Sequence, residues 1–363
     1  MVMKRFLLTL IIVYAGFSCF QVNAAIPPKA QLLITHPTAY NLEVLRTLNE
    51  KGLIDLSKIE LTGIYHVKEK YDYQGSKDYL KEHPFATIEL IPIDTPIKPG
   101  ELYKKNKLSN IYRELFETSD GIIFFGGPDI PPESYGEETH LTTAISDPYR
   151  HYFELSFLFH LLGGNQNQSF IALLEEKPAY VIYGFCLGMQ SMNVATGGKL
   201  VQDIPSEIYQ LNTIESILAL PKESMHRNYW RNITDDNLLF SGNFHPVQIN
   251  SGELFCLTGD HKDTSWVYSN HHQAIEETGK GFVPIAYSMD QKIIEGLRHT
   301  KYPNVLGVQF HPEGAYLYNE KIYKENPHSK ETTGFQLLIE RESLEFHQQY
   351  WSCFMERLTS IKK

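Results

Sequence analysis

A cysteine at the end of an apolar run has the setting that most clearly predicts chemistry in this sequence. Cys186 follows the apolar segment 180–185 and lies between Gly184 and Gly188. Small residues two before and two after a nucleophile let a strand turn sharply into a helix, because larger side chains would clash there. The N–H groups at the start of the helix would also favour the thiolate. Cys186 is therefore a candidate nucleophile, although G-x-C-x-G alone also fits a buried core cysteine.

A histidine and a glutamate after a second apolar strand supply the partners that such a nucleophile needs. The run 304–310 predicts a buried strand that continues into His311-Pro312-Glu313. Alternate strand residues share a face, so His311 and Glu313 project to the same side with Cα atoms about 7 Å apart. Pro312 fits the end of a strand because it donates no hydrogen bond. We expect Cys186, His311 and Glu313 to act as nucleophile, base and orienting carboxylate.

A glycine pair after a third apolar strand could help to stabilise the negative oxygen of a tetrahedral intermediate. The strand predicted over 121–125 breaks into Gly-Gly-Pro-Asp at 126–129. Glycine lets the backbone approach a substrate closely, so the N–H of Gly127 could join that of Leu187 in an oxyanion hole. The same four residues also fit an ordinary turn. We favour the oxyanion hole because all three candidate sites follow apolar strands, and open α/β sheets bind ligands at that edge.

The elements that must position these residues follow an alternating α/β order. Apolar residues recur at strand or helix spacing through the chain, and neither a repeat nor a low-complexity run interrupts them. Asp147-Pro148 offers an N-cap and a first-turn proline for one of the helices. The predicted elements are strands near 32–35 and 59–65, helices over 41–50, from Asp147 onward and from Cys186 to 197–198, and one surface helix over 335–358.

Two motifs together resemble the class I glutamine amidotransferase superfamily. They are Gly-Phe-Cys-Leu-Gly-Met-Gln at 184–190 and Gly-Val-Gln-Phe-His-Pro-Glu at 307–313. The resemblance covers about residues 30–355 and implies an α/β fold of three layers, with a mostly parallel central sheet, helices on both faces and a nucleophile elbow. Three further segments are more narrowly similar to the γ-glutamyl-γ-aminobutyrate hydrolase group of the C26 cysteine peptidases: 126–138, 193–204 and 269–273.

This resemblance implies a freestanding cysteine hydrolase that cleaves the γ-glutamyl amide bonds of small γ-glutamyl compounds. The reaction would pass through a γ-glutamyl thioester on Cys186, with the triad named above. By the same resemblance, Gly126, Gln190 and His272 would contact the substrate. The mechanism requires no organic cofactor and no metal.

Departures from the family pattern leave the amine leaving group open. Leu187 stands where the closest hydrolases more often have arginine, and the segments 64–85, 99–112 and 205–245 look longer than the family core. Loops of this kind shape a pocket. The alternatives are a folate polyglutamate γ-glutamyl hydrolase, a glutaminase or amidotransferase subunit that passes ammonia to a partner, and a non-catalytic γ-glutamyl-binding protein.

The N-terminus has the composition of a secretory signal peptide. Lys4 and Arg5 precede an apolar segment over 6–20, and small residues occur in a cleavage-like setting at 22–24. The apolar run is shorter than the about 20 residues of a membrane-spanning helix. We therefore predict a signal peptide over 1–24, with an uncleaved anchor and a lipoprotein attached through a cysteine as alternatives.

The remaining residues, 25–363, are expected to form a single exported domain in the periplasm or outside the cell. The net charge is −10 for the whole chain and becomes −12 without the leader, which argues against nucleic acid as a partner. We expect a small-molecule γ-glutamyl substrate and no stable membrane insertion after signal cleavage. A homodimer is left open.

Cysteine and histidine usage adds two further expectations. An odd cysteine count after export suggests one functional free thiol, Cys186, whereas Cys256 and Cys353 could form a disulfide or remain two core thiols. The adjacent pair His271-His272 could suggest a metal site. Neighbouring strand residues point to opposite faces, however, and no Cys/His spacing of zinc type is present. We therefore predict no metal.

Overall fold

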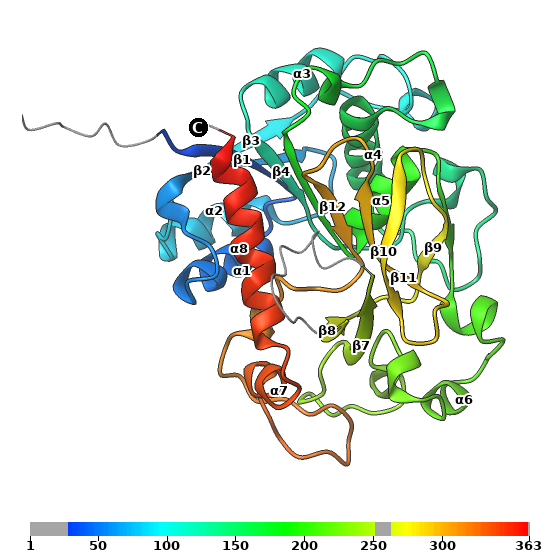
Figure 1. Cartoon of the computed structure of the whole chain (residues 1–363). Coiled ribbons are helices and arrows are strands. Elements are labelled where there is room, and N and C mark those ends of the chain that lie inside the picture. Colours follow the sequence, from blue (N-terminus) through cyan, green and yellow to red (C-terminus); the bar gives the residue numbers. More distant parts are fainter. Residues whose placement is uncertain (1–27, 251–262, 362–363) are drawn as a thin grey trace, which may run out of the picture.

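A central sheet of ten strands organises the part of the chain that the structure, a computed structural model, describes: residues 28–250 and 263–361. The predicted leader over 1–24 and Cys256 lie outside the described residues. Six neighbouring strands run parallel, and four antiparallel strands continue the sheet beyond β12 (Figure 1). The strand order is β3 (Ile88–Ile93), β2 (Ile59–His66), β1 (Ala30–Thr35), β4 (Gly121–Phe124), β5 (Val181–Phe185), β12 (Val305–Val308), β11 (Ile294–His299), β10 (Phe282–Ser288), β7 (Asn243–Ile249) and β8 (Thr264–Ser269).

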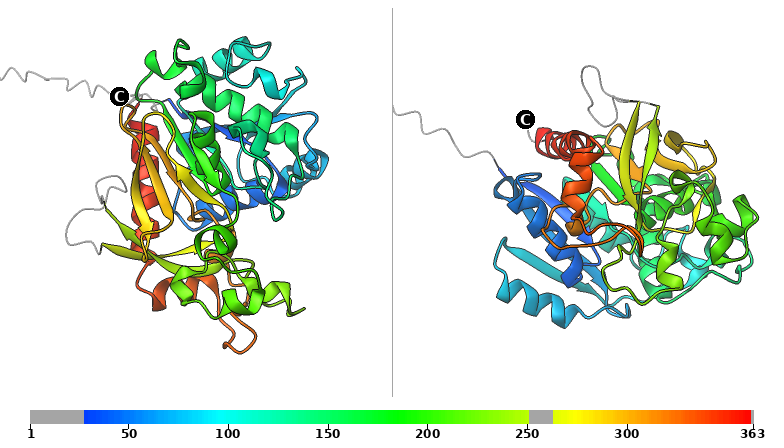
Figure 2. Two further views of the ribbon diagram at one scale, coloured as in Figure 1. Left: turned by 90° about the vertical axis from the view of Figure 1, so that its right-hand side faces the viewer. Right: turned by 90° about the horizontal axis from the view of Figure 1, so that it is seen from below.

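Helices cover both faces of this sheet, and each face has its own apolar core. The first core joins the sheet to α1 (Ala39–Glu50) and α8 (Leu344–Ser360), with α2 (Tyr73–Glu82) packed beside α1. The second core joins it to α3 (Ser109–Glu117), α4 (Pro148–Leu162) and α5 (Leu187–Ala195). The left view of Figure 2 shows α8 and the green helices on opposite sides of the sheet. The predicted three-layer α/β fold with a mostly parallel sheet is confirmed.

Local sequence explains the central elements. Every residue of β4, β5 and β12 is buried, as expected for parallel strands covered on both faces, which read as continuous apolar runs. The Asp147 side chain accepts a hydrogen bond from the backbone N–H of Arg150 at 3.3 Å, and Pro148 occupies the first turn of α4. The predicted start of this helix is therefore confirmed.

The prediction of one helix over 335–358 is wrong. Two helices occupy this segment, α7 (Gly334–Glu340) and α8, and Glu342 between them has a positive φ of 51°. Aromatic side chains at helical spacing on α8, including Trp351 and Phe354, are buried against the sheet. The chain changes direction between the two helices, so the apolar stripe of α8 is separate from that of α7. The helical spacing in the sequence did not reveal this change.

Smaller elements surround the edge where the parallel strands end. They are α6 (Ile214–Leu218) and a two-stranded antiparallel sheet of β6 (Lys199–Val201) and β9 (Ala274–Glu277). Cys353 on α8 is disulfide-bonded. Among the described helices, none combines the length and the apolar character needed to cross a membrane.

Candidate active site

Cys186 lies in a strained turn between β5 and α5. Its backbone has a φ of 50° and a ψ of −105°, a conformation that a non-glycine residue adopts only where its surroundings impose it. A Cβ atom added to Gly188 would lie 2.1 Å from the backbone oxygen of Phe124, and one added to Gly184 would lie 2.6 Å from Met192 Sδ. The two glycines therefore permit the close packing of strand and helix that holds the sulfur in place.

His311 lies beside Cys186, and Glu313 orients it. The Nδ1 atom of His311 is 2.7 Å from Glu313 Oε1, and the imidazole lies close to Cys186, because a Cβ atom added to Gly126 would meet both His311 Cε1 and Cys186 Cβ. Burial alone would lower the pKa of His311, but its electrostatic interactions with Glu313 and Cys186 raise it well above its ordinary value. The structure thus places His311 between Cys186 and the orienting carboxylate of Glu313.

The turn that carries His311 and Glu313 is fixed by its surroundings. The backbone N–H of His311 donates to the carbonyl of Tyr268 at 2.8 Å. The carbonyl of Pro312 accepts hydrogen bonds from the Tyr318 hydroxyl at 2.6 Å and from Trp351 Nε1 at 3.2 Å. The second of these donors belongs to α8, so the C-terminal helix directly supports the candidate site.

Two glutamines connect Cys186 to the core beneath it. Gln309 Nε2 lies 3.6 Å from Cys186 Sγ, and Gln190 Nε2 donates to Gln309 Oε1 at 3.2 Å and to the carbonyl of Gln273 at 3.3 Å. Gln190, which was predicted to contact the substrate, is only 3% exposed, and Gln309 lies between it and the sulfur. Gln309 was not among the residues predicted from the sequence. The available signal was its position two residues before His311, on the same face of a strand.

Gly126 and Gly127 form a loop against Cys186 and His311. A Cβ atom added to Gly126 would lie 2.9 Å from His311 Cε1 and 3.6 Å from Cys186 Cβ. The Gly127 N–H donates no hydrogen bond to another described residue. Leu187 begins α5, so its N–H has no acceptor within the helix. Leu187 therefore follows the nucleophile in the chain, and Gly127 follows the glycine that packs against the nucleophile.

Arg150 on α4 holds the glycine loop from the opposite side. Its Nη2 atom donates to the carbonyls of Phe125 at 3.0 Å and Gly126 at 3.2 Å. In a trans peptide the C=O and the following N–H point in opposite directions, and the described residues contain no cis peptide. By binding the Gly126 carbonyl, Arg150 turns the Gly127 N–H away from α4. No spacing in the sequence pointed to this residue.

A buried ionic network neutralises Arg150. Arg150 Nη2 lies 3.6 Å from Glu154 Oε2, which lies 2.8 Å from His36 Nε2, and His36 Nδ1 lies 2.7 Å from Glu69 Oε2. Burial alone would raise the pKa of Glu154, but Arg150 and His36 lower it to about 2. The network joins the ends of β1 and β2 to α4. Arg150, which binds the glycine loop, is therefore held in place by paired charges.

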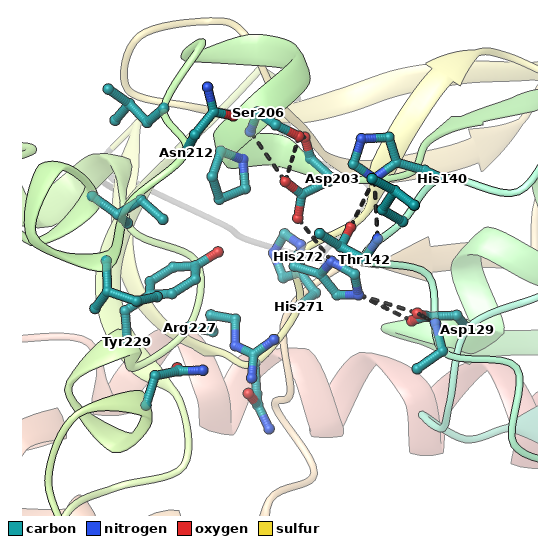
Figure 3. A pocket seen from close by; sticks show the side chains of 18 of the residues that line it. Asp129, His140, Thr142, Asp203, Ser206, Asn212, Arg227, Tyr229, His271 and His272 are labelled. Atoms are coloured by element: carbon teal, nitrogen blue, oxygen red, sulfur yellow. Dashed lines mark hydrogen bonds and ion pairs between the residues drawn. The ribbon is translucent and has the colours of Figure 1, made fainter.

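A pocket of about 760 Å³ adjoins the glycine loop. Its lining begins with Pro128 and Asp129 and includes His272 and residues of the long segment 205–245 (Figure 3). His272 lies between two carboxylates, with Nε2 3.2 Å from Asp129 and Nδ1 3.1 Å from Asp203. Burial alone would lower its pKa, but the hydrogen bonds to these carboxylates raise it to about 9. His272 is therefore a cation at neutral pH.

The comparison with known protein families decides the family of this chain. The family model described as Peptidase C26 matches residues 102–313, more than half of the chain. The chain belongs to the peptidase C26 family. The matched range contains the glycine loop, Cys186, His311 and Glu313. The family membership and the relatives below identify a glutamine amidotransferase-like hydrolase.

Several relatives of this C26 protein have names that describe the same superfamily. A glutamine amidotransferase-like protein of Lactococcus lactis is 29% identical over 66% of this chain and 80% of its own length. A protein of Mycobacterium tuberculosis named as a glutamine amidotransferase is 34% identical over 58% of this chain and 55% of its own length. The γ-glutamyl-γ-aminobutyrate hydrolase of Escherichia coli K12 is 26% identical over 56% of this chain and 68% of its own length.

The predicted residues of this C26 protein lie in three neighbouring places, and Gly126 packs against His311 and Cys186. Cys186, His311, Glu313 and the two oxyanion donors form the first group. His272 belongs to the adjoining pocket, whereas Gln190 lies under the first group. This arrangement can generate a nucleophilic sulfur, return a proton to a leaving group and bind a negative oxygen.

Proposed function

We propose that this protein is a cysteine hydrolase that cleaves γ-glutamyl amide bonds of small γ-glutamyl compounds. The observation that carries the proposal is the placing of His311, bound to Glu313, next to Cys186 and beside a glycine loop. The relationship to a γ-glutamyl-γ-aminobutyrate hydrolase supports the choice of bond. The amine leaving group remains the open part of the substrate.

The proposed reaction has two halves. His311, oriented by Glu313, takes the proton of Cys186, and the thiolate attacks the γ-carbonyl carbon of the substrate. The N–H groups of Gly127 and Leu187 bind the oxygen that becomes negative. His311 then protonates the amine, the C–N bond breaks, and a thioester forms on Cys186. Water, deprotonated by His311, hydrolyses the thioester and releases glutamate.

The adjoining pocket supports a substrate with charged groups. Arg227 lies in its lining with its guanidinium 5.4 Å from the Tyr229 ring centroid, and His272 carries a positive charge there. Arg227 suits a carboxylate of a γ-glutamyl compound, whereas His272 with its two carboxylates, Asp129 and Asp203, forms a net negative cluster that suits an ammonium group. Both Arg227 and Tyr229 come from the long segment 205–245, which was expected from the sequence to shape the pocket.

Glutamate release tests this proposal. We would incubate the purified chain and its Cys186→Ala variant with γ-glutamyl-γ-aminobutyrate, γ-glutamyl peptides, glutamine and polyglutamylated folate. Release by the wild type and none by the folded variant is the expected result, and the substrate with the highest kcat/KM would identify the leaving group. Equal release by both proteins would overturn the proposal.

A silent panel would favour the other candidate roles. The folded, reduced protein would then be tested for γ-glutamyl binding by calorimetry and for ammonia transfer with co-purified partners. Binding without turnover would indicate a binding protein, and glutaminase activity that appears only with a partner would indicate an amidotransferase subunit. Either outcome would contradict the freestanding hydrolase.

We also propose that the protein is exported, with cleavage after residue 24. The positive charges and the apolar segment at the N-terminus support this proposal. The disulfide bond of Cys353 is a second support, because disulfides persist mainly in oxidising compartments. Mass spectrometry of the protein recovered from each cell fraction tests it. Recovery of the uncut chain from the cytoplasm would contradict export.

A further inference from the structure

Three side chains of types that commonly bind metal ions lie close together in the interior beside the pocket. His226, His271 and Glu295 each offer a ligand atom, and these atoms lie within 4.8 Å of one another. His226 Nδ1 is 3.0 Å from Glu295 Oε1. The exposed fractions of the three residues are 2%, 5% and 0% respectively. They come from separate parts of the chain: the segment 205–245, the turn after β8, and strand β11.

The hydrogen bonds around His271 leave one of its lone pairs without a donor. His271 Nδ1 lies 2.8 Å from the carbonyl oxygen of Gln273. A carbonyl only accepts hydrogen bonds, so Nδ1 must carry the proton and Nε2 must carry a lone pair. The Nε2 atom is buried and has no hydrogen-bond partner among the described residues. Its lone pair therefore faces the cluster unsatisfied.

Glu295 adds a carboxylate that also lacks donors. Neither of its buried oxygens accepts a hydrogen bond with proper geometry from a described residue. A neutral His226 has one N–H and one lone pair, so it can supply at most one proton to the cluster. The neighbouring His245 supplies none, because its Nδ1 faces the carbonyl of Pro246 at 3.3 Å and its Nε2 contacts the Ser269 hydroxyl at 2.8 Å. The neighbouring histidines therefore supply fewer protons than the lone pairs of His271 and Glu295 could accept.

We propose that a divalent transition-metal ion, best matched by Zn²⁺, binds His226, His271 and Glu295. Two imidazole nitrogens and one carboxylate form a donor set that Zn²⁺ prefers over Mg²⁺ or Ca²⁺, which favour oxygen ligands alone. The hydrogen bond from His271 Nδ1 to the Gln273 carbonyl is the outer contact that typically orients a metal-binding histidine. His271 also lines the pocket, which supplies a route for the ion. The proposal departs from the prediction of no metal, because these ligands come from distant segments and share no short spacing.

The ion would join the inserted segment to the candidate active site. His226 belongs to the segment that supplies Arg227 to the pocket, and His271 directly precedes His272. The backbone carbonyl of Glu295 accepts from the N–H of Gln309 at 2.9 Å, and Gln309 contacts Cys186. The metal therefore has a structural role in this proposal: it fixes the pocket wall and takes no part in bond cleavage.

Metal content tests this inference without any substrate. The full chain is purified, loaded with Zn²⁺ and dialysed. We expect it to retain one Zn²⁺ per chain, as measured by elemental mass spectrometry. Co²⁺ in its place is expected to give the visible absorption of a low-coordinate site with nitrogen and oxygen ligands. Zn²⁺ should also raise the melting temperature, and a chelator should lower it again.

Substitutions place the metal at this cluster. Glu295→Gln and His226→Asn are expected to lose the bound Zn²⁺ and the Co²⁺ absorption. His299→Asn is the matched control, because it replaces a buried histidine at the end of the same strand, β11, and should retain both. If a cluster variant does not fold, the Co²⁺ spectrum of the wild type decides. A folded wild type that keeps no metal after loading, or a Glu295→Gln variant that keeps it fully, overturns the inference.

Discussion

At the scale of single residues, the candidate site depends on individual contacts from supporting side chains. Glu313 orients His311, Gln309 contacts the sulfur of Cys186, and Arg150 binds the carbonyl of Gly126. These contacts use polar groups buried on strand ends and on α4. A small displacement of one supporting residue should therefore reach the reacting atoms, because catalytic geometry tolerates little error.

Replacement of Arg150 by lysine tests its role in positioning the Gly127 N–H. Lysine keeps the charge next to Glu154, but its ammonium is a point charge on a stem of different shape and cannot place a donor where Nη2 reaches the carbonyls of Phe125 and Gly126. We expect kcat for the proposed hydrolysis to fall about 100-fold, the usual cost of losing one oxyanion donor, with KM little changed. Steady-state kinetics on the best γ-glutamyl substrate would measure this split.

Alkylation of Cys186 separates this effect from a general disturbance. Reaction of the thiolate with iodoacetamide uses the Cys186–His311 pair and needs no oxyanion hole, so its rate should be the same in wild type and Arg150→Lys. An unchanged kcat would remove Arg150 from any positioning role. Equal losses in alkylation and turnover would place the defect at the nucleophile instead.

At the scale of elements, the turn from β5 into α5 is the most tightly specified junction. Gly188→Ala would place a Cβ 2.1 Å from the Phe124 oxygen, so α5 must move away from β4. We expect this variant to lose about 2 kcal/mol or more of unfolding free energy, as overpacked cores commonly do. Gly100→Ala is the control, because a Cβ there has no neighbour within 4 Å.

Chemical denaturation of both variants would measure the difference. The Gly188→Ala midpoint should fall with an unchanged slope, and the Gly100→Ala midpoint should stay near that of the wild type. Equal stability of the two variants would mean that β4 and α5 are packed less closely than described.

Helix α8 supports the site from the other side of the sheet. Trp351→Phe removes the Nε1 donor to the Pro312 carbonyl but keeps an aromatic ring in the core. Loss of this hydrogen bond should cost about 1 kcal/mol of unfolding free energy. Thermal melting would record the loss, and Trp230→Phe, at a partly exposed position outside this contact, provides the comparison.

At the scale of the whole molecule, the pocket is built from segments far apart in the chain. Asp129 follows β4, Asp203 follows β6, and His272 follows β8, yet one imidazole bridges both carboxylates. The contact closes one wall of the pocket and links the main sheet to the small β6–β9 sheet. Its strength should depend on pH, because His272 and Asp203 both have shifted pKa values.

The sign of this pH dependence follows from the two shifted pKa values. The pKa of His272 rises from 6.5 to about 9, so its contribution is fully present below pH 6.5 and is lost as the pH rises through about 9. The pKa of Asp203 falls from 3.8 to about 2, so its contribution is present above pH 3.8 and is lost as the pH falls through about 2. The bridge should stabilise the protein most between pH 3.8 and pH 6.5, where both contributions are fully present.

Melting temperatures of wild type and His272→Gln across this range test the bridge. We expect the largest difference at about pH 5–6, where the linkage contribution is on the order of a few kcal/mol, and a small difference at about pH 10. A difference that does not change with pH would show that His272 is neutral in the folded protein.

The sequence by itself determined the class of the fold and predicted the residues that meet at the candidate site. Small residues around Cys186, alternation from His311 to Glu313, and apolar strands before each motif are local requirements, so they are visible in a linear chain. Tertiary structure alone decided the supporting contacts. Arg150 reaches the glycine loop from α4, Trp351 reaches Pro312 from α8, and His226 of the segment 205–245 meets Glu295 of β11. Such contacts depend on how elements far apart in the chain pack together, and residue spacing in the sequence does not predict this packing.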